Sequence, residues 1–221
     1  MVELNKHKIG CFIHSTYMDV WKDEILIMIL RKIFDSGLIH KLDFIYVNNI
    51  GTPIDLRRKG WVHEKLIIHN FSSDLNLFEN CTIRSLNQFT KLRPEYKLLY
   101  MHTKGVSYPK NHEFVPSILA WINYMMYCLI DKENECLQLL DTYDTVSCNY
   151  RMRTHDQTNP PHYSGSFWWV NADYASTLPV YYMNDKYHAE FWLCQNKPFY
   201  FNICTLFHMY QVNYKLENYK K

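Results

Sequence analysis

Short apolar runs alternate with longer amphipathic stretches along the first 150 residues of the chain. Each apolar run has the length of a buried strand, and most of them end in a cluster of polar residues. We predict strands at Ile9–Ile13, Phe44–Val47, Lys65–His69, Lys97–Met101, Thr145–Tyr150 and Phe167–Val170.

The stretches between these runs carry apolar residues three or four positions apart, which is the spacing of a helix with one buried face. Glycine and proline mark where two of the helices stop, near Gly37 and before Pro94. We predict helices over Trp21–Ile39, Glu79–Leu92 and Phe114–Leu140 (with a break around Asp131–Asn134), a short helix near Ala189–Cys194, and an extended run at Phe199–Ile203.

This alternation predicts an α/β fold with a mixed, mostly parallel central sheet flanked by helices. No repeat or linker divides the chain, so we expect a single domain over residues 1–221. Ligands of such sheets bind beyond the carboxyl ends of the strands. Polar clusters fall at those ends, at His14–Tyr17, Asn48–Asn49, Asn70–Asp74, His102–Lys104 and Asn149–Arg153.

Composition narrows the function classes. The net charge is only +2, with 24 basic against 22 acidic residues, which excludes a strongly basic nucleic-acid binder and predicts no nucleic-acid partner. The six glycines form neither G-x-x-x-x-G-K nor G-x-G-x-x-G, so nucleotide binding of those two types is excluded. Apolar residues make up 48% of the chain, which is enough for a sizeable core.

The seven cysteines are dispersed and form no C-x-x-C pair, which predicts reduced, buried thiols rather than a disulfide framework or a zinc ribbon. The first residues contain no long apolar stretch, so we expect no signal peptide. No run approaches the ~18 apolar residues that a membrane span needs. These features predict a cytoplasmic protein without a transmembrane segment.

The sharpest local pattern is the strand end Leu99–Gly105. His102 and Lys104 are two positions apart, so in extended backbone both project to the same side and can face one anionic ligand such as a diphosphate. The alternative is that His102 only caps the strand while Lys104 is solvated. Charge and spacing leave both interpretations open.

These residues, with others, carry a family resemblance. The segment YKLLYMHTKGVSY, the Glu79–Thr82 stretch before it, and HYSGSFWWVN at 162–171 resemble the motifs of small GT-A-type glycosyltransferase domains. Such domains occur in large DNA viruses, including chlorella-virus-like enzymes, and in bacterial polysaccharide loci. The family pattern A-E-x-W is similar to Ala189–Trp192, and the resemblance covers about residues 8–195.

The resemblance implies a glycosyltransferase that moves a sugar from a nucleotide-sugar donor, a UDP-sugar in most such families, to a glycan acceptor hydroxyl with inversion. The partners that it implies are a small-molecule nucleotide sugar and a glycan acceptor. It leaves the oligomeric state open. The residues it implies for the donor are His14, Ser15, Thr16, Tyr17, Asn48, Asn49, Arg58, His102, Thr103, Lys104 and Gly105. Those it implies for the sugar or acceptor are His162, Ser164, Gly165, Trp169 and His188.

Glu190 is the acid of the A-E-x-W match, and with His102 it is the candidate for catalysis. An inverting transferase needs a base that removes the acceptor proton. The alternative is that Glu190 caps its helix or pairs with Lys186. Arg151 and Arg153 follow a predicted strand and are further candidates for phosphate contacts.

Metal dependence stays open. Many GT-A enzymes hold a divalent cation with Asp-x-Asp after the fourth strand, and His102-Thr103-Lys104 stands at that place here. Lysine supplies positive charge directly, whereas histidine can donate to phosphate or bind a metal such as manganese or magnesium. Asp74-Leu75-Asn76 is similar to Asp-x-Asp but suits a turn or a helix cap.

Two further classes compete with an active transferase. One is a catalytically inactive nucleotide- or carbohydrate-binding module with the same fold, which the missing Asp-x-Asp favours. The other is a metal hydrolase or cysteine enzyme, which the chain does not favour because it lacks H-E-x-x-H and its histidines are dispersed.

Overall fold

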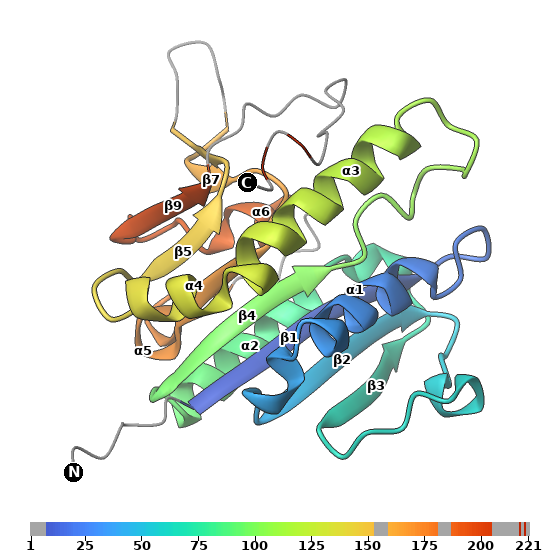
Figure 1. Ribbon diagram of the computed structural model, residues 1–221, viewed down its shortest axis with the longest axis horizontal. Helices are drawn as coiled ribbons and strands as arrows, with labels where there is room; N and C mark the ends of the chain where they lie inside the picture. Colours follow the sequence, from blue (N-terminus) through green and yellow to red (C-terminus); the bar gives the residue numbers. More distant parts are fainter. Residues whose placement is uncertain (1–7, 153–158, 181–186, 205–216, 218, 220–221) are drawn as a thin grey trace.

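A seven-stranded sheet forms the centre of the molecule (Figure 1). The computed structural model describes residues 8–152, 159–180, 187–204, 217 and 219. Within this part of the chain the strands lie in the order β3–β2–β1–β4–β8–β5–β9. They are β1 Lys8–Tyr17, β2 Phe44–Gly51, β3 Leu66–Ser72, β4 Tyr96–His102, β5 Thr145–Cys148, β8 Trp168–Asn171 and β9 Tyr200–Cys204.

Strand direction confirms the mixed, mostly parallel sheet. β3, β2, β1 and β4 are parallel to one another, and β5 is parallel to β9. Strand β8 is antiparallel to both of its neighbours, β4 and β5. The carboxyl ends of the other six strands therefore lie at one edge, and the start of β8 lies there with them.

Helices cover both faces of the sheet. In Figure 1 the helices α1 (Glu24–Asp35) and α3 (Val115–Met126) lie in front of the sheet, and α2 (Asn80–Leu92) lies behind it. Alternate residues of each strand enter the two layers. On β1, Cys11 and Ile13 join the core with α1 and α3, whereas Phe12 joins an aromatic core with α2, α5 (Ala172–Ser176) and α6 (His188–Trp192).

Helix α1 buries Ile25, Ile29 and Ile33, which are four positions apart and hence on one side of the helix. The helix ends before Gly37, whose φ of 81° is left-handed, so the predicted glycine stop is confirmed. The predicted start at Trp21 is wrong. Trp21 precedes the helix, where its indole Nε1 donates to the carbonyl of Tyr108 at 2.7 Å.

The predicted break in the long helix is confirmed. A π-helical turn at Tyr127–Asp131 separates α3 from α4 (Glu133–Leu139). The carbonyl of Leu129 in this turn accepts a hydrogen bond from Trp169 Nε1 at 2.8 Å. The turn thereby connects the helical layer to β8.

The first two strands are longer than predicted. The polar residues His14–Tyr17 and Asn48–Asn49 belong to β1 and β2, not to loops. They stay extended because β1 and β2 continue to pair as far as Tyr17 and Gly51. The polar groups at these ends are therefore held by the sheet itself.

The region after β5 differs most from prediction. Strand β5 ends at Cys148 because Asn149 adopts a left-handed φ of 61°. A small hairpin of β6 (Tyr150–Arg151) and β7 (His162–Tyr163) and the helix α5 were not predicted. Arg153 and Lys186 lie outside the described residues.

All seven cysteine thiols are free, and six of them are buried, as predicted. Burial raises the pKa of the Cys194 thiol to about 12. No helix within the described ranges is long and apolar enough to cross a membrane.

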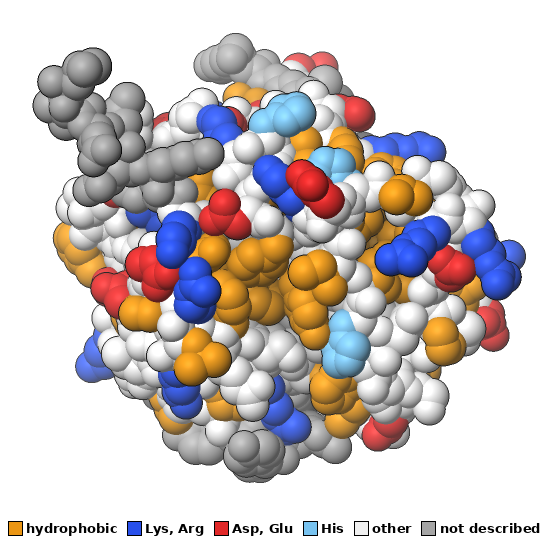
Figure 2. Space-filling model, turned by 90° about the horizontal axis from the view of Figure 1, so that it is seen from below, with side chains coloured by type: hydrophobic (Ala, Val, Ile, Leu, Met, Phe, Trp, Pro, Cys, Tyr) orange, Lys and Arg blue, Asp and Glu red, His pale blue; other side chains and the backbone are white. Residues whose placement is uncertain are grey.

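The edge strand β3 retains apolar surface. Ile67 and Phe71 point to the same side of the sheet as Tyr46 and are 48% and 44% exposed. Figure 2 views the molecule from below the orientation of Figure 1, the side on which β3 lies, and hydrophobic side chains gather near the centre of that view.

Candidate active site at the carboxyl edge of the sheet

A row of polar side chains crosses the sheet near its carboxyl edge. His14 on β1 is in register with Asn48 on β2 and His102 on β4, and Asn48 is in register with His69 on β3. Residues in register on parallel strands project to the same face, here the one that α2 covers. The sheet therefore brings together three of the predicted donor-binding residues.

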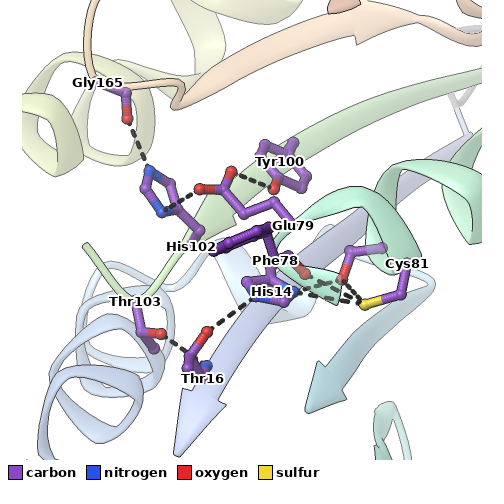
Figure 3. Close-up of polar contacts among 10 residues, drawn as sticks. His14, Thr16, Phe78, Glu79, Cys81, Tyr100, His102, Thr103 and Gly165 are labelled. Atoms are coloured by element: carbon purple, nitrogen blue, oxygen red, sulfur yellow. Dashed lines mark hydrogen bonds and ion pairs between the residues drawn. The ribbon is translucent and has the colours of Figure 1, made fainter. Parts of the chain in front are cut away.

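His14 is held on both sides of its ring (Figure 3). Its Nδ1 lies 2.8 Å from the hydroxyl of Thr82, at the start of α2, and its Nε2 lies 3.0 Å from the hydroxyl of Thr16. The Cys81 thiol is a third neighbour, 3.9 Å from Nδ1. His14 is 2% exposed, so its ring positions other residues rather than facing solvent.

His102 forms the centre of a second chain of contacts (Figure 3). Its Nε2 donates to the carbonyl of Gly165 at 2.9 Å, and its Nδ1 lies 3.2 Å from Glu79 Oε1. The Tyr100 hydroxyl donates to the other oxygen of Glu79 at 2.8 Å. Both ring nitrogens of His102 therefore face protein groups.

Burial disfavours the charged form of both imidazoles. Burial lowers the pKa of His14 to about 4. Burial, helped by the charge of Lys104, lowers the pKa of His102 to about 3. The positive charge of this part of the edge accordingly comes from Lys104, not from the histidines.

The turn after β4 is fixed to β1. The Thr103 hydroxyl accepts from the backbone N–H of Thr16 at 2.9 Å, and the Thr103 N–H donates to the carbonyl of His14 at 3.0 Å. Lys104 follows directly, with its ammonium 4.1 Å from the centre of the Trp121 ring. Thr103 is therefore a positioning residue for the end of β1, and Lys104 is the charged group that this turn presents.

Three asparagines at this edge have unpaired buried amide atoms. Asn48 Nδ2, Asn49 Oδ1 and both polar side-chain atoms of Asn149 have no hydrogen-bond partner among the described residues. Each such atom costs about 1–3 kcal/mol when it stays unpaired. A polar ligand at the edge is one way to satisfy them.

The turn at Gly165 requires glycine. Its φ is +99°, and an added Cβ would lie 2.5 Å from Met125 Sδ and 2.8 Å from the Trp121 ring. This close approach lets the Gly165 carbonyl accept from His102 and lets the Ser164 N–H donate to the carbonyl of Asn149 at 3.1 Å. The predicted contact of Gly165 with a sugar or acceptor stays a prediction.

We expect Gly165→Ala to lower the free energy of unfolding by about 2–3 kcal/mol, because it adds both steric overlap and left-handed strain. Chemical denaturation followed by fluorescence measures this change. Gly60→Ala is a matched control, since Gly60 is also left-handed, at φ 81°, but has no atom within 4 Å of the added Cβ. Equal losses in the two variants would contradict the packing argument.

Trp169 is not an acceptor platform. Its ring is fully buried, and its Nε1 donates a hydrogen bond to the carbonyl of Leu129. Trp168 is 1% exposed and stacks on Tyr100 with 4.5 Å between the ring centroids. Successive strand residues point to opposite faces, and here helices cover both faces. The prediction that Trp169 contacts the sugar or acceptor is therefore wrong.

The remaining candidates are more scattered. Arg58 is exposed and pairs with Asp55, its Nε 3.1 Å from Oδ2, so its contact with a donor stays a prediction. His162 is buried, its Nδ1 2.8 Å from the carbonyl of Pro160 and its ring 5.1 Å from that of Phe191. Ser15 and Ser164 are buried, Gly105 packs on Ile118 with φ 83°, and Tyr17 and His188 are half-buried.

Glu190 lies in the first turn of α6 and is half-buried. Its charge raises the pKa of His102, opposing the larger lowering by burial, so Glu190 acts electrostatically on the same imidazole as Glu79. The structure thus relates Glu190 to the carboxyl edge of the sheet. The motif resemblance includes Glu79, Thr82 and Tyr100 but assigns them no role; their contacts with His14 and His102 follow only from the packing of α2 against β1 and β4.

A divalent cation does not fit the turn after β4. Lysine is no metal ligand at neutral pH, and both nitrogens of His102 are engaged by Gly165 and Glu79. No group of three or more metal-binding side chains occurs among residues 8–152, 159–180 and 187–204. Residues 102–104 therefore do not provide a metal site equivalent to Asp-x-Asp.

The fold and the polar edge together define an α/β protein with a candidate ligand site at the carboxyl ends of its strands. Residues 30–204 match the model of a family described as a domain of unknown function, DUF8361, and the chain belongs to this family. No curated protein matches the chain. Among solved structures, the crystal structure of 4-diphosphocytidyl-2C-methyl-D-erythritol synthase is similar with a TM-score of 0.42, 9% identity and 83% coverage of each chain.

Proposed function

We propose that the protein is a glycosyltransferase that uses a nucleotide-sugar donor, a UDP-sugar, and transfers the sugar to a hydroxyl of a glycan acceptor. The proposal rests on the row of polar side chains formed by His14, Asn48 and His102 at the carboxyl edge of the parallel strands. Lys104 follows this row and supplies its positive charge. This edge is where α/β sheets bind ligands. The motif resemblance to small GT-A-type domains adds the sugar chemistry.

In this proposal Lys104 binds the donor diphosphate, since a charge-assisted contact suits a phosphate oxygen. The unpaired amide of Asn48, on the same face of the sheet as His14, contacts the nucleoside, and Thr16 and Tyr17 lie at the end of β1. Because residues 102–104 do not fit a divalent cation, positive charge from the protein takes its place.

The chemical step that we propose is a single inverting displacement. Glu190 removes the proton of the acceptor hydroxyl as its oxygen bonds to the anomeric carbon. The bond from that carbon to the diphosphate oxygen breaks, and the nucleoside diphosphate leaves with its negative charge next to Lys104. The products are the extended glycan and UDP.

We expect UDP to stabilise the protein more than GDP, CMP or dTDP do. At a hundred times its dissociation constant a ligand stabilises by ~2.7 kcal/mol, which corresponds to a rise of about 5–10 °C in Tm for a chain of this size. Thermal unfolding with each nucleotide measures this, with manganese in one series and a chelator in the other.

Equal stabilisation by GDP and CMP would overturn the uridine assignment. A shift that requires manganese would mean that a metal, not Lys104, neutralises the diphosphate.

The inactive binding module is favoured by one observation: residues 102–104, which the structure describes, do not form a site that fits a divalent cation. The two candidates make the same prediction for UDP binding but differ in turnover. Release of UDP from UDP-sugars, with and without glycan acceptors, separates them.

A further inference from the structure

The contact between Glu79 and His102 requires a proton that neither group carries in its usual form at neutral pH. Because Nε2 of His102 donates to the carbonyl of Gly165, the Nδ1 of a neutral ring carries a lone pair, not a proton. That lone pair faces Glu79 Oε1 at 3.2 Å. Two groups that only accept hydrogen bonds repel each other at this distance, so a proton must lie between them.

The surroundings favour the same conclusion. Tyr100 donates to Glu79 Oε2, which orients the carboxyl group so that Oε1 points at the ring. His102 is 8% exposed, and its burial disfavours a bare carboxylate against an unprotonated nitrogen. The charged and titratable groups that face His102 come from several elements: His14 of β1, Glu79 at the start of α2, Tyr100 of β4, Lys104 of the following turn and Glu190 of α6.

We infer that Glu79 and His102 share one proton between Oε1 and Nδ1 at neutral pH, and that Glu79 is thereby the positioning residue of the site. The pair has no net charge, whichever atom holds the proton. Glu79 therefore adds no negative charge next to Lys104. The shared proton also fixes the ring with Nε2–H toward Gly165, which holds the turn at the start of β8.

The consequence for an anionic ligand rests on the proposed function, in which Lys104 binds a diphosphate. A bare carboxylate at position 79 would cancel part of the positive charge that attracts it. A carboxyl group that shares its proton with the imidazole keeps the geometry without that cost. The shared proton would then explain how a site for phosphate can contain the acidic residue Glu79.

Histidine ¹⁵N NMR of the whole protein at pH 7 tests the inference directly. We expect Nε2 of His102 to be protonated and Nδ1 to resonate between the values of a protonated and a bare nitrogen. The signals are assigned by their loss in His102→Gln. In Glu79→Gln the side-chain amide N–H donates to Nδ1, and the Nδ1 signal should move to that of an unprotonated nitrogen.

An unprotonated Nδ1 in the unmodified protein, or an identical Nδ1 signal in Glu79→Gln, would overturn the inference. The unmodified protein gives this readout by itself, so a variant that fails to fold does not prevent the test. Tyr100→Phe is the matched control, because it removes a hydrogen bond from the same carboxyl group and leaves the shared proton in place.

A second measurement uses UDP as the probe. With a shared proton, Glu79→Gln should change the Kd for UDP by less than threefold, since no charge is lost. A tenfold tighter Kd in this variant would indicate a bare carboxylate and contradict the inference. If UDP binds neither protein, the proposed function fails, and the NMR result still decides whether the proton is shared.

Discussion

Glu190→Gln should lower turnover by ~10²–10⁴, because the amide cannot take up the proton of the acceptor hydroxyl. The side chain keeps its size, and it lies in the first turn of a short helix, so fold and donor affinity should be unchanged. The effect should fall on kcat with a sugar acceptor, while the Kd for UDP stays within about twofold. Steady-state release of UDP and calorimetric titration of UDP measure the two quantities.

Glu135→Gln is the matched control for this experiment. Glu135 also lies in the first turn of a helix, α4, but its carboxylate is near Lys132, 3.7 Å from Nζ, instead of the carboxyl edge. It should retain full turnover. Retained turnover in Glu190→Gln would mean that Glu190 caps its helix or orients a sugar, and a product with retained anomeric configuration would contradict the inverting displacement.

Lys104→Ala is expected to weaken UDP binding by about 10- to 150-fold. A charge-assisted contact to phosphate contributes about 1.5–3 kcal/mol, and a factor of ten in Kd is 1.4 kcal/mol. Neither the buried His14 nor the His102–Glu79 pair, which has no net charge, offers a replacement charge. Calorimetry at two salt concentrations measures the loss, and the salt dependence of Kd should be smaller in the variant.

Lys91→Ala removes the same charge from the exposed last turn of α2, whose first residues contact His14. Its UDP affinity should equal that of the unmodified protein. If Lys104→Ala binds UDP normally, the Lys104 ammonium only contacts the Trp121 ring, and its assignment to the phosphate is wrong.

His102→Ala should weaken UDP binding less than Lys104→Ala does.

The sheet was predictable because strand and helix periodicities differ. Runs such as Lys97–Met101 are too short and too apolar for anything but a buried strand, and the spacing of Ile25, Ile29 and Ile33 indicates a helix with one buried side. His14 near the end of β1 and His102 at the end of β4 were recognisable because ligands of parallel sheets bind at that edge.

The partners of those histidines could not be predicted. Glu79 and Thr82 reach the site only because the start of α2 lies against the ends of β1 and β4, a tertiary contact that periodicity does not encode. The same limit applies to Trp169: its residue type suits a sugar platform, but its burial depends on helices packed on both faces. Asparagine tolerates left-handed backbone, but the residue type alone does not show that β5 ends at Cys148 rather than at the predicted Tyr150.

The antiparallel strand β8 has a consequence for how the chain folds. Strand β4 is buried along its whole length, yet one of its edges pairs with β8, a strand far later in the sequence. Until residues 168–171 have left the ribosome, this edge of β4 presents unpaired backbone groups beside an apolar surface. We therefore expect a chain cut before β8 to leave this edge of β4 open to pairing with a strand of a second chain.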